Sequence, residues 1–277
     1  MKQITLEDVS NWVPVREKDT YKNKMGHVLC VGGNENMGGA IILSASAALN
    51  AGAGLVTVAS APENMHALHA RNPEAMFVNM YDVEAVKEIL PNVDVIVLGP
   101  GMGTSKQSTE VFHHIIDGLN ENQWLILDGD GITHYVNHKN SLDVPTDKVI
   151  FTPHPGEWKR LTDIAPPAED LEENKQQAYG LDAVIVLKKE RTEIYIDDEV
   201  WQNTAGNPSM ATGGMGDTLT GILASFLGQF QNKKQAILSA VYVHSAVADE
   251  LAETHYVTLP TKIIQSLPKF INKITKN

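Results

Sequence analysis

Residues 203–221 read Asn-Thr-Ala-Gly-Asn-Pro-Ser-Met-Ala-Thr-Gly-Gly-Met-Gly-Asp-Thr-Leu-Thr-Gly, and they join a turn-forming segment to a helical pattern. Three glycines, Gly213, Gly214 and Gly216, stand where this helix is expected to begin. They let the backbone come close to a ligand and leave its N–H groups bare. Together with the positive end of the helix dipole, these groups form an anion site, for which a polyphosphate is the expected ligand. The helix itself is marked by apolar residues at the spacing of one helix face: Leu219, Ile222, Leu223, Phe226 and Leu227.

Asp217 follows directly after these glycines. A carboxylate beside a phosphate repels it, so a pure anion site gains nothing from this residue. Its position is easier to explain if Asp217 is a base that takes the proton from a hydroxyl group attacking phosphorus. The alternative is that Asp217 caps the helix and that the glycines form a tight turn.

The composition predicts an ordinary globular protein that is large enough for one α/β domain. Of its 277 residues, 43% are hydrophobic and 20% are charged. The net charge of −12 argues against nucleic acid and anionic membranes as partners, because both need a basic face. We see neither a secretory signal nor a membrane span, so we expect a cytoplasmic protein. The single cysteine, Cys30, lies in an apolar run and is expected to be a buried structural thiol.

Strands and helices are expected to alternate along one domain that spans residues 1–277. Residues 1–26 show little periodicity and are expected to form an irregular lead-in. Apolar runs predict strands at 27–31, 55–59, 93–98, 124–127, 148–151 and 183–187, with a hairpin on the sheet edge at 192–196 and 200–203. Helices are expected at 38–51, 83–90, 111–119, 167–179, 215–230 and 233–255, and from 261 onward. This alternation predicts a mostly parallel central sheet with helices on both faces.

Ligands of such sheets bind beyond the carboxyl ends of the strands. Glycine-rich and polar turns follow the expected strands at 32–39, 99–104, 128–131, 152–157, 188–192 and 204–217, and parallel strands would bring them to one edge. The familiar nucleotide motifs are absent. The dinucleotide fingerprint fails at Thr104, and the chain contains no P-loop. A late, glycine-rich helix start is therefore the expected phosphate site.

The segment Gly213-Gly214-Met215-Gly216-Asp217 resembles the anion hole of the ribokinase-like superfamily. Further segments, taken in order along the chain, narrow the resemblance to the ADP-dependent NAD(P)H-hydrate dehydratases. They are Gly32-Gly33-Asn34 with Gly38-Gly39-Ala40, Gly99-Pro100-Gly101-Met102-Gly103, Asp128-Gly129-Asp130, Thr152-Pro153-His154-Pro155-Gly156-Glu157, and Asn203-Thr204 with Gly206-Asn207. The resemblance covers the chain from about residue 20 to 255 and implies a ribokinase-like α/β fold.

The resemblance also implies a reaction that repairs a damaged cofactor. The substrate would be the 6S hydrate of NADH or NADPH, which carries a hydroxyl group on the nicotinamide ring. ADP would be the co-substrate, used with Mg²⁺, and the products would be AMP, phosphate and NAD(P)H. Hydroxide is a poor leaving group, but once phosphorylated it can be expelled by the lone pair of the ring nitrogen. The resemblance further implies a homo-oligomer, a tetramer, and a separate NAD(P)H-hydrate epimerase as its functional partner.

Roles for single residues follow from the family's motifs. Asp217 matches both the base and a substrate-binding position, and the other substrate-binding positions fall on Ala40, Gly103 and His154. The amides of Gly214, Met215 and Gly216 would hold the phosphoryl group during transfer. The family's nucleotide-binding segment falls on Lys188, Lys189, Glu190, Arg191 and Thr192.

Simpler explanations stand beside several of these roles. The small residues at 40 and 103 fit close packing, His154 fits a structural role, and the charges at 188–192 fit a cluster on an edge strand. Glu157 is the candidate that places Mg²⁺ through water, with helix capping as the alternative. Asp128 and Asp130 suit contacts to metal or ribose, or a plain turn.

Two other functions use the same features. An ATP-dependent kinase of a small alcohol, such as a vitamin precursor, needs the same anion hole and the same base, but it leaves the phosphate on its product. A non-catalytic nucleotide sensor would bind phosphate at the glycines but gains nothing from Asp217.

Overall fold

The six expected apolar runs each form a strand that is covered on both faces. They are β2 (His27–Val31), β3 (Leu55–Ser60), β5 (Val95–Leu98), β6 (Trp124–Leu127), β7 (Val149–Phe151) and β8 (Val184–Leu187). Alternate side chains enter opposite cores, so that Val28 and Cys30 lie on one side of the sheet and Leu29 and Val31 on the other. Continuous apolar runs are what strands need when helices cover both faces. Cys30 is fully buried as predicted, and burial raises the pKa of its thiol to about 12.

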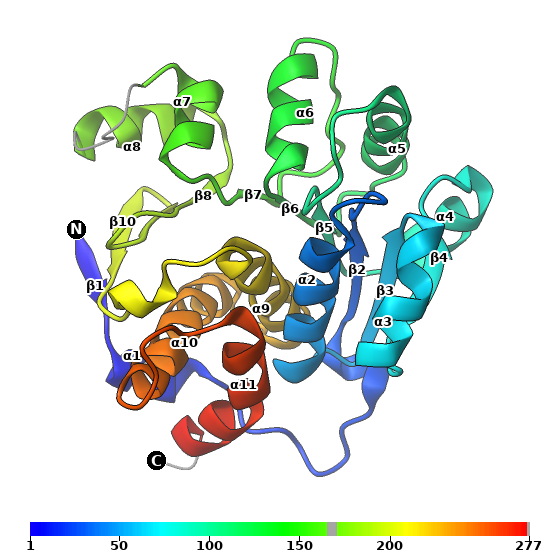
Figure 1. The fold of residues 1–277 in the computed structure, drawn as a ribbon. Coiled ribbons are helices and arrows are strands. Elements are labelled where there is room, and N and C mark those ends of the chain that lie inside the picture. The colour runs from blue at the N-terminus through cyan, green and yellow to red at the C-terminus, as the bar shows by residue number, and fades with distance from the viewer. Residues whose placement is uncertain (165–170, 276–277) are drawn as a thin grey trace.

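The computed structural model describes residues 1–164 and 171–275, and these residues form one sheet of ten strands (Figure 1). The strand order is β1-β10-β9-β8-β7-β6-β5-β2-β3-β4. Neighbouring strands pair in parallel, except that β9 (Glu193–Ile196) is antiparallel to both β8 and β10 (Glu199–Asn203). The register between β2 and β5 pairs Val28 with Val95. The predicted α/β fold with a mostly parallel sheet is confirmed.

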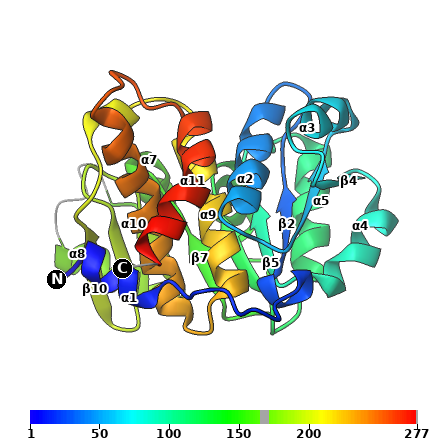
Figure 2. The same cartoon turned by 90° about the horizontal axis from the view of Figure 1, so that it is seen from below.

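Helices form a layer on each face of this sheet (Figures 1 and 2). One layer contains α1 (Leu6–Trp12), α2 (Gly38–Asn50), α3 (Met65–Arg71), α9 (Met215–Gln229), α10 (Lys233–Ala252) and α11 (Pro260–Ile274). The other contains α4 (Val83–Ile89), α5 (Lys106–Asp117), α6 (Asp130–His138), α7 (Pro155–Thr162) and α8 (Leu171–Gly180). Each layer encloses its own apolar core. None of the described helices is long and apolar enough to cross a membrane.

The prediction of an irregular lead-in at residues 1–26 is wrong for its first half, whereas residues 13–21 form neither helix nor strand. Strand β1 (Lys2–Ile4) pairs in parallel with β10, and Thr5 then caps α1. Thr5 Oγ1 accepts the Asp8 N–H at 3.2 Å, and the Asp8 carboxylate accepts the Thr5 N–H at 3.0 Å. This reciprocal capping box starts a helix of only seven residues. Strand β1, and not the predicted hairpin, is therefore the edge of the sheet.

Strand β4 (Met76–Asn79) and helices α3, α6 and α7 were not expected from the sequence. Helices α6 and α7 begin inside the turns predicted at 128–131 and 152–157. Asp130 and Pro155 act there as first residues of helices, a position that Pro in particular favours. The helix predicted at 167–179 is present as α8 from Leu171, and its positions 167–170 lie outside the described residues.

Helix α9 packs closely against α2, and Gly221 makes this approach possible. A Cβ atom at position 221 would overlap the Ser44 carbonyl oxygen and lie 2.8 Å from Ala47 Cβ. Ser44 also donates a hydrogen bond from Oγ to the Asp217 carbonyl oxygen at 2.9 Å. The packing of the two helices thus fixes the first turn of α9, where the predicted site lies.

We expect the substitution Gly221→Ala to destabilise the protein by about 1–3 kcal/mol, because the backbone of α2 must move to admit the methyl group. Thermal unfolding measures this effect. Gly180→Ala is the matched control, since a Cβ atom there meets nothing within 4 Å. An unfolding midpoint for Gly221→Ala that equals the control's would contradict the close packing.

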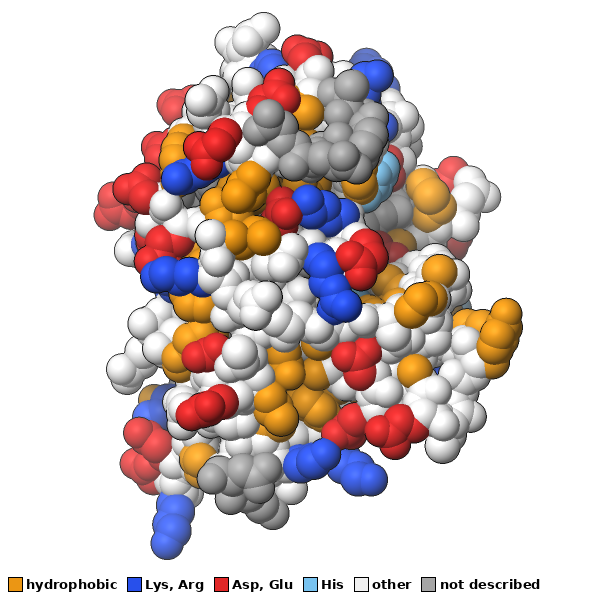
Figure 3. Space-filling view, turned by 90° about the vertical axis from the view of Figure 1, so that its left-hand side faces the viewer, with side chains coloured by type: hydrophobic (Ala, Val, Ile, Leu, Met, Phe, Trp, Pro, Cys, Tyr) orange, Lys and Arg blue, Asp and Glu red, His pale blue; other side chains and the backbone are white. Residues whose placement is uncertain are grey.

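On the side of the molecule seen in Figure 3, the acidic side chains are spread over the surface and do not form one continuous negative patch. Acidic and basic side chains are interspersed over this face, with small apolar groups between them. This agrees with a net charge of −12 in which 22 Lys and Arg residues accompany 34 Asp and Glu residues.

Candidate active site

The first turn of α9 presents bare backbone N–H groups. Gly214 is the residue before the helix and has a φ angle of +90°, a left-handed conformation that glycine adopts readily. A Cβ atom at Gly214 would lie 2.5 Å from Leu43 Cδ1, so side chains are excluded here. None of the described side chains caps this helix start, and the suggestion that Asp217 is its cap is wrong. The turn is therefore open to an anionic ligand.

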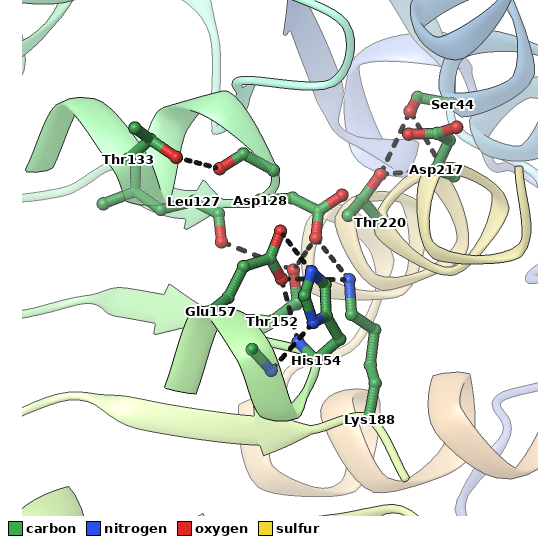
Figure 4. A network of polar contacts seen from close by, with 12 residues as sticks. Ser44, Leu127, Asp128, Thr133, Thr152, His154, Glu157, Lys188, Asp217 and Thr220 are labelled. Atoms are coloured by element: carbon green, nitrogen blue, oxygen red, sulfur yellow. Dashed lines mark hydrogen bonds and ion pairs between the residues drawn. The ribbon is translucent and has the colours of Figure 1, made fainter. Parts of the chain in front are cut away.

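Asp217 lies in this turn and is held by its backbone, not by its side chain. Its carbonyl oxygen accepts hydrogen bonds from Ser44 Oγ at 2.9 Å and Thr220 Oγ1 at 2.7 Å (Figure 4). Within residues 1–164 and 171–275, its carboxylate makes no hydrogen bond or ion pair. Burial raises the pKa of this carboxyl to about 6, with the Asp128 and Glu157 charges adding to the rise and Lys188 opposing it. An unpaired acid with a pKa near neutrality is suited to general base catalysis.

A buried ion pair lies beside this turn. The ends of β6 and β8 bring Asp128 and Lys188 together, with Lys188 Nζ 2.6 Å from Asp128 Oδ1. Thr152, which follows β7, donates to the same carboxylate oxygen at 2.6 Å (Figure 4). Burial alone would lower the pKa of the Lys188 ammonium, but the charges of Asp128, Glu157 and Asp217 raise it overall. Lys188 therefore remains a cation next to the helix start.

The lysine reaches the glycines of α9 directly. A Cβ atom at Gly216 would lie 3.0 Å from Lys188 Nζ and 3.7 Å from Asp128 Oδ2. A phosphate at the helix start would thus meet backbone N–H groups and an ammonium together. Both are donors that stabilise charge on a transferring phosphoryl group.

Two cavities meet at this turn. The first cavity has a volume of about 550 Å³ and the second of about 440 Å³. Gly216 lines the first cavity and Asp217, the next residue, lines the second. The first cavity is bounded by residues 188–192, 205–208, 210–211, 215–216 and 244–245, with Asn203 and Leu219. The second is bounded by residues 36–37, 39–40, 100–101 and 129–130, with Thr133, Glu157, Arg160 and Asp217.

The predicted nucleotide-binding residues lie together at the first cavity. All five residues of the 188–192 segment line it, as do Met215 and Gly216 but not Gly214. Lys189 Nζ lies 2.6 Å from Glu193 Oε1, and Arg191 donates to the Thr204 carbonyl oxygen at 2.6 Å. The alternative of a charge cluster on an edge strand is wrong, because β8 lies between β7 and β9.

The loop at residues 203–208, which lines this cavity, is held against α10 by hydrogen bonds. Asp249 accepts hydrogen bonds from the Gly206 N–H at 2.9 Å and from Asn207 Nδ2 at 2.6 Å. Asn203 Nδ2 donates to Ser245 Oγ at 2.9 Å. The polar residues at 203–207 therefore shape the wall of the cavity through contacts that the sequence alone did not indicate.

The predicted substrate-binding residues are only partly brought together. Ala40, on the first turn of α2, and Asp217 both line the second cavity. Gly103 and His154 are not among the described residues that line it. The Gly103 N–H donates to Asp130 Oδ2 at 2.7 Å, and its carbonyl oxygen accepts from His134 Nε2 at 2.9 Å.

His154 and Glu157 form the start of α7. His154 Nδ1 accepts the Gly156 N–H at 3.0 Å, and the His154 N–H donates to Glu157 Oε2 at 2.8 Å. The capping alternative for Glu157 is therefore confirmed. Glu157 nevertheless lines the second cavity and lies 4.0 Å from Lys188 Nζ, so it also belongs to the carboxylate cluster around the ammonium. The imidazole of His154 is half exposed.

The turn at 128–131 is more than a plain turn. Asp128 pairs with Lys188, and Asp130 holds the backbone of Gly103. Sequence reasoning left these partners out, because Asp128 and Lys188 are 60 residues apart and meet only through the sheet.

Two further residues at the cavities were missed. Arg160 lines the second cavity from α7, and His244 lines the first from α10. His244 is buried and its Nε2 has no hydrogen-bond partner among the described residues. Burial, followed by the Lys188 charge, lowers the pKa of this imidazole to about 4. Neither residue carried a sequence signal, since Arg160 lies beyond the turn predicted at 152–157 and His244 stands alone within the helix predicted at 233–255.

Fold and site together define a class. A late helix with bare N–H groups and an unpaired acid, set beyond the carboxyl ends of a mostly parallel sheet, places the chain among ribokinase-like proteins, as the sequence resemblance implied. A solved structure from Enterococcus faecalis, described as a ribokinase-like superfamily protein, matches with a TM-score of 0.96 at 42% identity. The match covers 100% of this chain and 97% of that one.

Within this class, one family model matches most of the chain. The family model for NAD(P)H-hydrate dehydratase matches residues 28–269, and the chain belongs to this family. An ADP-dependent (S)-NAD(P)H-hydrate dehydratase of Enterococcus faecalis is 43% identical over 273 residues, which are 99% of this chain and 94% of that protein. The structure of the ADP/ATP-dependent NAD(P)H-hydrate dehydratase of Bacillus subtilis, co-crystallised with ATP and Mg²⁺, matches with a TM-score of 0.85 at 27% identity. That match covers 98% of this chain and 97% of the other.

Proposed function

We propose that this protein is an ADP-dependent NAD(P)H-hydrate dehydratase, which converts the 6S hydrate of NADH or NADPH to NAD(P)H. The observation that carries the proposal is the position of two consecutive residues. Gly216 lines one cavity and Asp217 lines the other, so an anion-binding helix start lies between two ligand spaces. Transfer of a phosphoryl group from ADP in the first cavity to a hydroxyl group in the second needs this arrangement.

The first step is phosphorylation of the hydrate. The Asp217 carboxylate takes the proton of the ring hydroxyl, whose oxygen attacks the β-phosphorus of ADP while the bond to AMP breaks. The N–H groups of Gly214, Met215 and Gly216 and the Lys188 ammonium offset the charge that develops on the phosphoryl oxygens. The products of this step are AMP and a phosphorylated hydrate.

The second step is elimination. The lone pair of the ring nitrogen expels phosphate from the carbon that carried the hydroxyl group, and loss of a proton from the neighbouring carbon restores the ring double bond. Phosphate is a far better leaving group than hydroxide, so the kinase-like first step makes the dehydration possible.

Mg²⁺ is the expected metal and would neutralise phosphate charge when it is bound with ADP. Asp128 and Glu157 would hold it through water. No group of three His, Cys, Asp or Glu residues within 1–164 and 171–275 is arranged to hold a metal directly, which fits indirect coordination. Asp128 keeps Oδ2 for a water molecule, because Lys188 and Thr152 both bond its Oδ1. Both oxygens of Glu157 face His154, Oε2 at its backbone N–H and Oε1 at its Nε2, so a water molecule would share one of them.

We assign the remaining predicted residues to substrate and nucleotide. Ala40 would let the nicotinamide ring approach the first turn of α2, while Gly103 and His154 would contact the more distant parts of the hydrate. Lys188, Lys189, Glu190, Arg191 and Thr192 would contact ADP, because all five line the first cavity. We also propose a cytoplasmic homotetramer that works beside a separate epimerase. The family resemblance alone supports these last points, and light scattering would test the tetramer.

A decisive experiment supplies NADH hydrate and Mg²⁺ with either ADP or ATP and follows the absorbance of NADH and the release of phosphate. Recovery of absorbance with ADP and equimolar phosphate supports the proposal. Recovery with ATP alone keeps the reaction but overturns the donor. No recovery with either nucleotide, from folded protein, would instead favour the ATP-dependent kinase of a small alcohol.

The raised pKa of Asp217 predicts a pH profile. Because the carboxylate is the base, kcat/KM for the hydrate is expected to rise with pH through about 6 and to level above it. Initial rates between pH 5 and 8, at saturating ADP, measure this. ADP affinity determined by calorimetry over the same range is the control, since phosphate groups also titrate near pH 6. A flat profile would exclude Asp217 as the base.

A further inference from the structure

Arg160 lies on α7, one helical turn after Glu157, and lines the second cavity. Of the described residues that line this cavity, it is the only Lys or Arg. The other charged residues there, Asp130, Glu157 and Asp217, are all acids. The second cavity is thus acidic apart from a single guanidinium.

An acidic cavity is unfavourable for the negatively charged substrate proposed above, unless Arg160 takes part in binding it. NADH hydrate carries a pyrophosphate with two negative charges, and NADPH hydrate adds a 2′-phosphate. Three carboxylates repel such a ligand, and Lys188 is already paired with Asp128 at 2.6 Å. A small neutral alcohol, in contrast, would need no cation in this cavity.

The guanidinium of Arg160 is available for a ligand. Within the part of the chain that the structure describes, it makes no hydrogen bond or ion pair. Its natural partner at i−3 is Glu157, but both oxygens of that carboxylate face other groups. Oε2 accepts the His154 N–H and lies 4.0 Å from Lys188 Nζ, and Oε1 lies 3.4 Å from His154 Nε2. The cations of the first cavity differ, since Lys189 and Arg191 are already bound to protein oxygens.

We propose that Arg160 binds a phosphate group of the NAD(P)H hydrate, so that the second cavity selects a phosphorylated dinucleotide over a small alcohol. The inference rests on the proposed function. Arginine suits this role because its planar fork can donate two parallel hydrogen bonds to phosphate oxygens. The phosphate is either the pyrophosphate, which both hydrates carry, or the 2′-phosphate of NADPH hydrate.

The test compares Arg160→Gln and Arg160→Lys with Lys159→Gln, an exposed neighbour on α7 that does not line the cavity. We expect Arg160→Gln to raise KM for the hydrate about 10- to 100-fold, the usual effect of losing a charge-assisted hydrogen bond. Its kcat and its KM for ADP should stay within about twofold of wild type, and Arg160→Lys should recover part of the loss. Lys159→Gln should change none of these values.

The two hydrates identify the phosphate. A rise in KM for both hydrates indicates the pyrophosphate, and a rise for NADPH hydrate alone indicates the 2′-phosphate. Unchanged KM values for both would overturn the proposal for Arg160 while leaving the dehydratase assignment intact.

Calorimetry with NADPH separates the two proposals if the wild-type protein turns over neither hydrate. In that case the proposed function fails, and NADPH affinity still tests Arg160. Weaker binding of NADPH to Arg160→Gln than to wild type would keep the phosphate contact. Equal affinity, or no binding by wild type, would overturn it.

Discussion

Replacing Asp217 by asparagine is expected to lower kcat for hydrate dehydration by about 10²- to 10⁴-fold, the usual contribution of a positioned general base. Asparagine has nearly the same shape but cannot accept the proton of the ring hydroxyl. The backbone contacts of residue 217 to Ser44 and Thr220 do not depend on its side chain, so the first turn of α9 should stay in place. ADP binding should be unchanged or tighter, because a negative charge beside the phosphates is removed.

The same variant should be more stable than wild type above pH 6. The pKa of Asp217 is raised from 3.8 to about 6 in the folded protein. The contribution of this carboxyl to the free energy of unfolding is therefore fully present below pH 4, where it is protonated, and is lost as pH rises through 6. Removing the ionised carboxyl should therefore add up to about 2 kcal/mol at pH 7, and less where water screens the charge. Chemical unfolding at pH 5 and pH 7.5 measures the change.

Asp130→Asn is the matched comparison for the kinetic effect. Asp130 also lines the second cavity, but its carboxylate holds the Gly103 N–H at 2.7 Å and takes no proton from the substrate. That variant should mainly raise KM for the hydrate. Near-full turnover by Asp217→Asn, or an equal loss of kcat in both variants, would show that Asp217 is not the base.

The sequence was sufficient to predict the central strands and the edge of the sheet where the site lies. Residues 28–31 are apolar without interruption because both faces of β2 are buried, and this leaves a clear signal. The turn residues after such strands had to meet, because parallel strands end at one edge. Asp217 could be chosen as the candidate base because an acid among glycines that are expected to bind phosphate requires a chemical explanation.

The contacts within the site could not be predicted in the same way. Lys188 follows β8 and Asp128 follows β6, with β7 between these two strands, and no local sequence pattern indicates that they pair. Arg160 looks like an ordinary charged residue of a short helix until α7 is placed beside the second cavity. Strand β1 was missed for another reason: three residues with one buried side chain are too short to show a period.

The substitution Lys188→Met is expected to lower turnover at neutral pH by at least about 10²-fold and to weaken ADP binding as well. Lys188 Nζ lies 2.6 Å from Asp128 and beside Gly216, where the transferring phosphoryl group would be held. Methionine fills a similar volume but leaves Asp128, Glu157 and Asp217 without their shared cation. Breaking a buried pair in this way usually costs about 3–5 kcal/mol of stability.

The pH profile distinguishes this loss from that of Asp217→Asn. Lys188 lowers the pKa of Asp217, so without the ammonium that pKa should rise above 6 and the remaining activity should increase toward higher pH. Lys189→Met is the matched control, because Lys189 lines the same cavity but pairs with Glu193 away from the carboxylate cluster. The control should weaken ADP binding only slightly and leave the profile unmoved. If Lys188→Met kept both wild-type ADP affinity and the midpoint near pH 6, Lys188 would be a structural counter-ion of Asp128 and would take no part in phosphoryl transfer.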